Sequence, residues 1–275
     1  MSHILEIKDL QVQYHTEDGT VYALNHVDLE LDDGETLGLV GETGAGKTTL
    51  AKSIMRLIPD PPGKIEGGVI EFEGRDLLKA SGAEIRAVRG NQISMIFQDP
   101  MTGTAATMGI EENLALAKRR GKTRFLRPGI TRKERDEYRE LLKVLGLGLE
   151  DRLTSKVGLL SGGQRQALTL LMATLKKPKL LLLDEHTAAL DPKTAAKVLE
   201  ITDMIVNRDH LTTMMITHNM QDAINHGNRL IMMMEGKIIL DIEGEEKKKL
   251  TVRNLLDQFE KASGQEFSND SALLS

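Results

Sequence analysis

The chain has 275 residues, of which 40% are hydrophobic, which is enough for a sizeable core and excludes wholesale disorder. Its 36 basic and 41 acidic residues give a net charge of −5, so no overall basic field argues for nucleic acid as a partner. The absence of cysteine excludes disulfides and thiolate metal sites. The 3% aromatic content disfavours a stacking platform for single-stranded nucleic acid. No signal peptide and no apolar run long enough to span a bilayer is recognised, so we expect a soluble or peripheral protein.

The first elements change from antiparallel strands to a strand, loop and helix. Alternating apolar and polar residues predict paired antiparallel strands over residues 4–14 and 21–33. A short apolar strand at 35–40 is followed by the glycine-rich segment 41–46, and helical spacing at 47–58 ends at a proline-rich turn.

The rest of the chain alternates strands with helices. Strands are predicted at 67–74 and 93–97, and a charged helical lobe at 109–149 contains the amphipathic helix 130–148. Helices at 161–175 and 192–206 alternate with strands at 179–183 and 212–217, and a hairpin over 229–242 turns at Glu235 and Gly236. This alternation favours a mainly parallel sheet with helices on both faces.

The C-terminal end carries a charge run at 245–249, a candidate helix at 251–262 and a polar tail. The simplest interpretation of the charge run is a solvated face, and the last dozen residues are expected to be disordered.

A phosphate-binding loop is predicted after the strand at 35–40. Residues 41–48 match G-x-x-x-x-G-K-[ST], in which glycines let backbone N–H groups wrap phosphate oxygens at a helix N-terminus. Lys47 would reach the β and γ phosphates, and the Thr48 hydroxyl would ligate Mg²⁺. The alternative is a glycine-rich turn with a surface lysine, but the preceding strand and following helix favour nucleotide binding.

Two adjacent carboxylates, Asp184 and Glu185, follow the apolar run 180–183. Neighbouring carboxylates repel unless a cation, a shared proton or opposite directions relieve them. Because successive side chains of a strand face opposite ways, one could address Mg²⁺ and the other the attacking water. An apolar strand that simply ends in acids is the alternative, which the upstream phosphate loop makes the weaker one.

The segment 159–166, "LLSGGQRQ", could by itself be an ordinary helix N-cap. Together with the other motifs it resembles the signature of ATP-binding cassette (ABC) ATPases, and the resemblance covers roughly residues 3–242. It implies an α/β fold with a P-loop NTPase core, a mainly parallel sheet, an antiparallel β subdomain and an inserted α-helical subdomain. The implied ATPase domain is 1–243, with the helical subdomain at about 99–160, and 244–275 form a C-terminal helix and flexible tail.

The resemblance also implies roles for individual residues. Glu185, His218 and Gln98 are the catalytic candidates, Asp191 belongs to the D-loop, and Thr48, Gln98 and Asp184 would hold Mg²⁺. The implied nucleotide-binding residues are Tyr14, Gly41, Glu42, Thr43, Gly44, Ala45, Gly46, Lys47, Thr48 and Thr49. The implied signature, which would act on ATP held by a second subunit, is Leu160, Ser161, Gly162, Gly163 and Gln164.

Three positions leave alternatives open. Tyr14 stands where the family often stacks an aromatic on adenine, with Tyr22 as the less favoured candidate. His186 replaces the usual proline and Ala189 a common serine. We interpret His186 as a substitute loop residue that turns away from Glu185, and His218 as the active histidine.

The resemblance implies an ATPase that uses ATP and Mg²⁺, and whose subunits close as a homodimer or paired heterodimer on ATP and reopen on hydrolysis. Implied partners are transmembrane permease subunits and, indirectly, a solute-binding protein, with the chain at the cytoplasmic face of the membrane and no nucleic acid.

The two parts of the chain resemble different subfamilies of ABC ATPases. The N-terminal part resembles oligopeptide and dipeptide importer ATPases, and the part after about residues 101–107 resembles amino-acid importer ATPases. Divergence, recombination or design would each produce this change. We expect import of an amino acid or peptide-like solute; the alternatives are a soluble ABC ATPase of DNA repair or translation, and a cassette that binds ATP without hydrolysing it, for which no damaged motif is seen.

Overall fold

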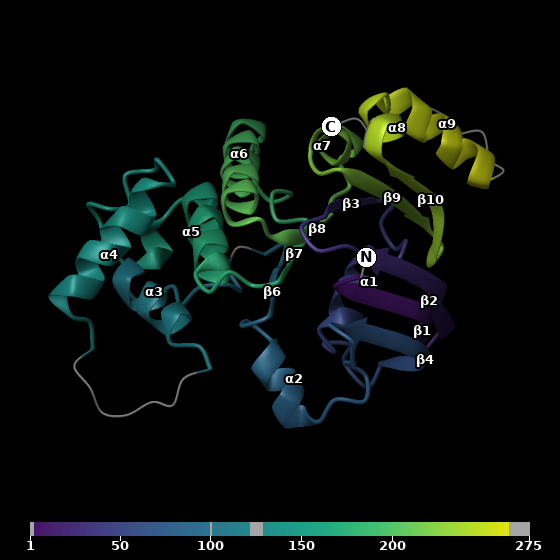
Figure 1. The fold of residues 1–275 in the computed structure, drawn as a ribbon, viewed down its shortest axis with the longest axis horizontal. Coiled ribbons are helices and arrows are strands. Elements are labelled where there is room, and N and C mark those ends of the chain that lie inside the picture. Colours follow the sequence, from purple (N-terminus) through teal and green to yellow (C-terminus); the bar gives the residue numbers. More distant parts are fainter. Residues whose placement is uncertain (1–2, 100, 122–128, 264–275) are drawn as a thin grey trace. The chain divides into compact units, whose positions relative to one another are not determined.

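A computed structural model describes residues 3–99, 101–121 and 129–263 (Figure 1). The chain divides into two compact units, residues 1–86 with 211–275 (the first unit) and residues 87–210 (the second unit). The predicted subdomain limits near 99 and 160 stay predictions, and the predicted flexible tail from residue 264 lies outside the described residues. Over the described ranges, no helix is both long and apolar enough to cross a bilayer.

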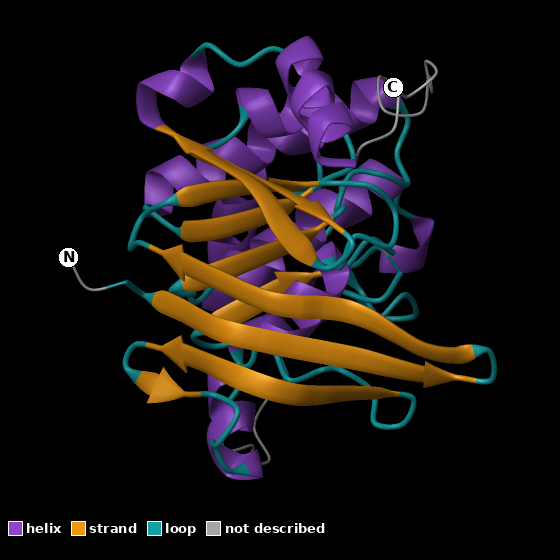
Figure 2. Ribbon diagram, turned by 90° about the vertical axis from the view of Figure 1, so that its right-hand side faces the viewer, coloured by secondary structure: helices purple, strands orange, loops and turns teal. Residues whose placement is uncertain are grey.

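The first unit contains the predicted antiparallel strands. β1 (Leu5–Thr16) lies between β2 (Gly19–Leu31) and β4 (Gly63–Phe72), and β5 (Arg75–Asp76) pairs with β4 (Figure 2). The apolar alternation of β1 shifts by one residue between Ile7 and Leu10, where the pairing register also shifts and Asp9 takes a φ of 51°. This bulge keeps Leu5, Ile7, Leu10 and Val12 all buried on one face.

A second sheet of the first unit is mainly parallel. β3 (Thr36–Val40) lies between the parallel strands β8 (Thr212–Ile216) and β9 (Arg229–Met234), and β10 (Lys237–Glu243) pairs antiparallel with β9. The predicted hairpin turn is confirmed at Glu235 and Gly236, which have φ angles of 47° and 75°.

Three helices of the first unit, α1 (Lys47–Ile54), α7 (Met220–Asn225) and α8 (Gly244–Lys248), are short. α1 ends four residues before the predicted limit, because Arg56 takes a left-handed φ of 49°. α7 and α8 were not predicted, whereas α9 (Val252–Ser263) was. α7 lies against β3 and α9, and α8 against β9 and β10 (Figure 1). The unpredicted α2 (Gly82–Val88) spans the boundary between the units.

The second unit pairs two parallel strands, β6 (Ile93–Ile96) and β7 (Leu180–Asp184). Its helices are α3 (Ile110–Lys118), α4 (Arg132–Lys143), the 3₁₀ turn η1 (Val157–Leu159), α5 (Gly162–Thr174) and α6 (Pro192–Asp209). α5 is buried on nearly all sides, which explains why its sequence is mainly apolar from residue 167 onward, although Arg165 and Gln166 are buried too.

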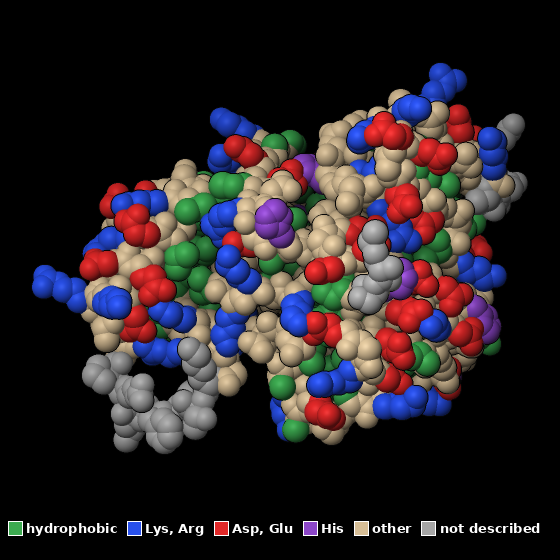
Figure 3. Space-filling model, viewed as in Figure 1, with side chains coloured by type: hydrophobic (Ala, Val, Ile, Leu, Met, Phe, Trp, Pro, Cys, Tyr) green, Lys and Arg blue, Asp and Glu red, His purple; other side chains and the backbone are tan. Residues whose placement is uncertain are grey.

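The amphipathic helix predicted at 130–148 is real but shorter. α4 begins after the capping residue Thr131 and ends at Lys143, and Gly146 then takes a left-handed φ of 63°. Its buried face carries Tyr138 and Leu142, and its other face carries basic and acidic side chains interspersed (Figure 3).

Candidate functional site

The phosphate loop connects the buried strand β3 to α1 and can be built only with glycine. Gly41, Gly44 and Gly46 have φ angles of 146°, 86° and 102°. A Cβ atom at Gly41 would lie 2.1 Å from the Met233 carbonyl oxygen, and one at Gly46 would lie 2.4 Å from that of Ala23. At Gly44 a Cβ would meet nothing within 4 Å, so this side of the loop is open to a phosphate group.

Lys47 is the first residue of α1, and its side chain folds back over the loop. It is 5% exposed, and its Nζ donates hydrogen bonds to the carbonyl oxygens of Gly41 (2.6 Å) and Glu42 (2.8 Å). A cation held over backbone carbonyls, beside the N–H groups that begin a helix, fits an anionic ligand. The loop therefore has the donors and the shape that a nucleotide's phosphates require.

His218 follows β8 at the same sheet edge as the phosphate loop. β3 and β8 are parallel neighbours with Leu39 opposite Ile216, so the segments after both strands leave the sheet together. Thr217 N donates to Leu39 O (3.1 Å), Asn219 N donates to Thr217 Oγ1 (3.0 Å), and Asn219 Oδ1 caps α7. The first unit thus brings His218 and the phosphate loop to one edge.

Tyr14 lies near the end of β1, opposite Val21 and Gly63. Its half-buried ring covers Gly63, where a Cβ atom would approach the ring to 2.7 Å. Tyr22, the less favoured candidate, is 60% exposed. Adenine stacking by Tyr14 stays a prediction.

In the second unit, β7 is fully buried up to Asp184, which is 4% exposed. The prediction that Asp184 and Glu185 alternate along one strand is wrong in detail, because the strand ends at Asp184 and Glu185 takes a left-handed φ of 48°. Ala188 N donates to Glu185 O (3.0 Å) and closes the turn that begins at Glu185. Left-handed backbone at a glutamate is strained, and such strain concentrates at functional sites.

His186 is buried and not available as an exposed base. It is 3% exposed, and its Nε2 lies 3.1 Å from Thr202 Oγ1 of α6. The Thr202 hydroxyl itself donates to Val198 O (2.9 Å), so Nε2 carries the proton of the bond to Thr202. The histidine anchors the turn after β7 to α6, in agreement with a structural role.

Gln98 follows β6, the parallel neighbour of β7, with Ile96 opposite Leu183. Gln98 is exposed and leaves the same edge as Asp184 and Glu185. Thr48 and Gln98 offer oxygen atoms and Asp184 a carboxylate, which are ligand types that Mg²⁺ accepts beside phosphate oxygens. Within the described ranges no group of three or more His, Asp or Glu could hold a metal without other ligands.

The predicted signature begins α5 and touches the segment after β7. Ser161 caps the helix by accepting from Gln164 N (3.3 Å), and Gln164 Oε1 accepts from Ser161 N (3.2 Å). A Cβ atom at Gly163 would lie only 2.1 Å from Thr194 Cγ2. The glycine therefore permits α5 to approach α6 closely.

Asp191 is the N-cap of α6, and its carboxylate accepts from Thr194 N (3.1 Å). Hydrogen bonding from the Thr194 side chain, and then from its backbone, holds the pKa of Asp191 below its usual value. Thr194 thus contacts both Asp191 and the start of the signature helix, which brings the predicted D-loop residue and the signature together.

Sequence reasoning missed Arg165, the residue after the signature. It is buried, with Nη2 donating to Val157 O and Gly158 O (both 3.3 Å) and Nη1 directed to Met101 Sδ. Arg165 therefore ties the loop after Gln98 to the turn before the signature. Arg165 is the one charged residue of α5, and that is the signal that could have identified it.

The comparisons with known proteins agree with this arrangement. Residues 24–188 match the family model "ABC transporter". The tyrosine transport ATP-binding protein of Clostridioides difficile is 40% identical over 262 residues, 94% of this chain and 100% of that protein. The oligopeptide transport ATP-binding protein OppD of Bacillus subtilis is 38% identical over 87% of this chain and 66% of its own length.

A solved ATP-binding cassette, dimeric and bound to ADP and Pi after hydrolysis, superposes with a TM-score of 0.73. It is 26% identical, and the match covers 87% of this chain and 98% of that one. Because the family model covers more than half of the chain and a relative is 40% identical over 94% of it, the chain belongs to the ABC transporter ATP-binding family, whose members are ATPases of a P-loop fold.

Proposed function

We propose that the chain is the ATP-hydrolysing subunit of an importer for an amino acid or peptide-like solute. The observation that carries this proposal is the glycine-built phosphate loop with buried Lys47, at the same sheet edge as His218. The named relatives are transport ATP-binding proteins for tyrosine and for oligopeptides, which supports import over DNA repair or translation. The match over the full length of the tyrosine transport protein favours an amino-acid cargo.

The proposed division of labour follows the chemistry of each residue. The loop's N–H groups and Lys47 bind the β and γ phosphates, and the ring of Tyr14 stacks on adenine. Glu185 polarises the attacking water, and His218 and Gln98 hold the γ-phosphate and water in line. Thr48, Gln98 and Asp184 would hold a magnesium ion, which would neutralise charge at the phosphates.

The signature acts on ATP bound by a second subunit. The exposed Ser161 hydroxyl and the N-terminus of α5 present donors and a positive helix pole, as an anion requires. ATP then favours a closed dimer because it binds both surfaces at once, and hydrolysis removes that preference. Permease subunits would use this cycle at the inner face of the membrane, with a solute-binding protein delivering the cargo.

ATP turnover by the purified chain tests the proposal. Lys47→Ala should lose most ATP binding and turnover, whereas Lys52→Ala, a lysine of the same helix outside the loop, should retain both. Tight ATP binding by Lys47→Ala would contradict the phosphate-loop assignment. Permease and solute-binding-protein genes beside this gene would support import, and proteoliposomes containing those permease subunits should take up solute only with ATP and this chain present.

A further inference from the structure

The charge run 245–249 is not uniformly solvated, because Lys247 at its centre is 3% exposed. Its Nζ donates to three carbonyl oxygens at the end of α7: Ile224 (2.8 Å), His226 (2.9 Å) and Gly227 (2.9 Å). The neighbouring Lys248 has a side chain that is 72% exposed and pairs with Glu245. The prediction of a solvated face is therefore wrong for Lys247 alone.

A buried ammonium at this position has a defined partner. The C-terminal carbonyls of a helix lack intrahelical donors and form its negative pole. A cation placed there donates hydrogen bonds to these carbonyls and also interacts favourably with the negative pole. Burial lowers the pKa of Lys247, and the three hydrogen bonds offset the unfavourable desolvation of its charge. Lys247 thus fixes the C-terminal end of α7.

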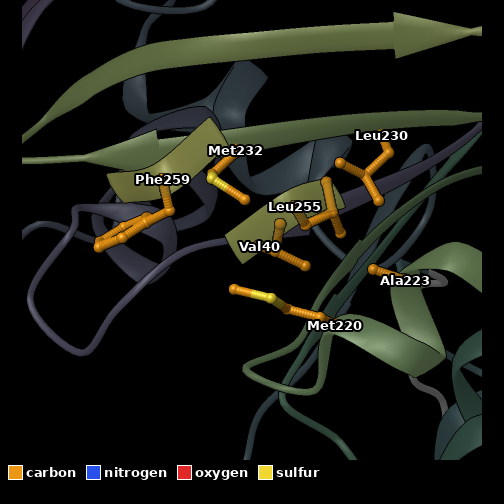
Figure 4. Close-up of a cluster of buried hydrophobic side chains, with 7 residues drawn as sticks. All are labelled: Val40, Met220, Ala223, Leu230, Met232, Leu255 and Phe259. Atoms are coloured by element: carbon orange, nitrogen blue, oxygen red, sulfur yellow. The ribbon is translucent and has the colours of Figure 1, made fainter. Parts of the chain in front are cut away.

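The apolar side of α7 is covered by α9, the helix that follows α8 in the chain. Seven buried residues form one cluster (Figure 4): Val40, Met220, Ala223, Leu230, Met232, Leu255 and Phe259. Met220 and Ala223 belong to α7, and Leu255 and Phe259 belong to α9. The cluster also contains Val40, the last residue before the phosphate loop.

α7 needs such support because it has only six residues. An isolated helix of that length is not stable in water, so packing must determine its position. On one side Ala223 lies so close to Gly38 of β3 that a Cβ atom there would be 3.2 Å from the Ala223 carbonyl oxygen. On the other sides the support comes from α8 and α9. His218 stands two residues before α7, so a shift of α7 displaces His218.

We propose that the C-terminal segment 244–263 positions His218 for hydrolysis, with Lys247 holding one end of α7 and Phe259 and Leu255 packing beneath it. This inference rests on the proposed role of His218 at the γ-phosphate. Lys247, Phe259 and Leu255 are positioning residues, since they touch α7 and its surroundings and act on the reaction through His218.

In the Lys247→Met variant, ATP turnover is expected to fall without loss of nucleotide affinity. Lys247→Met keeps the length of the side chain but removes the donors, and a displacement of about 1 Å in a reacting group can lower a rate by ~10²-fold. We expect kcat to fall by about tenfold or more, with the Kd for a non-hydrolysable ATP analogue within about twofold. Lys247→Arg should restore part of kcat because its guanidinium also donates to carbonyls.

The experiment is a double-mutant cycle on the full chain, with thermal melting to verify that each variant folds. His218→Ala, Lys247→Met and the double variant are compared, with Lys248→Met as the exposed control. If Lys247 acts through His218, the double variant should turn over no more slowly than His218→Ala. If Lys247→Met fails to fold, Phe259→Leu replaces it in the same double-mutant cycle.

The outcomes separate the two proposals. An unchanged kcat for His218→Ala would overturn the assigned role of His218 in the proposed function. A slow His218→Ala with an unchanged Lys247→Met, or with losses that multiply in the double variant, would overturn the positioning role alone. Slowing by Lys248→Met equal to that by Lys247→Met would also overturn it.

Discussion

Replacement of Gly163 by alanine tests the close approach of the signature helix to α6. The added Cβ would lie 2.1 Å from Thr194 Cγ2, whereas carbon atoms in contact normally lie about 3.5–4.0 Å apart. The overlap can be relieved if α5 and α6 separate, or if Thr194 rotates and gives up its side-chain hydrogen bond to Asp191. Each route disturbs the segment between β7 and α6.

The size of the effect follows from overpacking. An extra carbon forced into a packed contact lowers the free energy of unfolding by about 1–3 kcal/mol. Thr194→Ala removes the methyl group that the new Cβ would meet. We therefore expect Gly163→Ala to be destabilising alone and much less so in the presence of Thr194→Ala.

Urea unfolding of the wild type, both single variants and the double variant measures this coupling. We expect the double variant to be more stable than the sum of the single effects by about 1 kcal/mol or more. Effects that add to within about 0.5 kcal/mol would refute the contact between Gly163 and Thr194.

Three further predictions concern the backbone at Glu185, stacking on the adenine base and the half-buried carboxyl of Asp222. Glu185→Gly relieves the strain of the left-handed φ of 48° at this position. The free energy of unfolding should therefore be unchanged or rise by up to about 1 kcal/mol, while turnover is lost. A loss of stability in a urea titration would contradict the strain. Tyr14→Ala should raise the KM for ATP by roughly tenfold, a change within the free-energy range of base–aromatic stacking, whereas Tyr22→Ala should not. Equal KM values for wild type and Tyr14→Ala would exclude stacking. Burial raises the pKa of Asp222 above 3.8, despite the opposing charges of His226 and His218. The folded state then binds the proton more tightly than the unfolded state, so stability falls as pH rises above that value. Asp222→Asn should therefore melt higher than wild type at pH 7 but not near pH 3, and a melting difference independent of pH would contradict this reasoning.

The phosphate loop could be predicted because its requirements are local. Glycines at fixed spacing, a lysine and a helix start lie within ten residues, and the φ angles at Gly41, Gly44 and Gly46 confirm why glycine is needed. The order of strands and helices was also recognisable, since the apolar periods differ between the two. The ends of α1 and α4 were not, because single left-handed residues terminate helices whose apolar spacing continues.

The environment of Lys247 could not be predicted from the sequence. Its burial depends on the carbonyls of α7, a helix too short to give a periodic signal and about twenty residues earlier in the chain. The left-handed backbone at Glu185 was missed for a related reason: a strand pattern does not reveal where the backbone turns out of the strand. In both cases tertiary contacts determine the conformation.

The central claim, that ATP closes two copies and that Glu185 drives their reopening, is tested most directly by Glu185→Gln. The account predicts that light scattering of this variant gives the mass of two chains with ATP and of one chain without it, while turnover falls by about 10²-fold or more. A variant that keeps the mass of one chain in ATP and hydrolyses ATP at the wild-type rate would contradict the account.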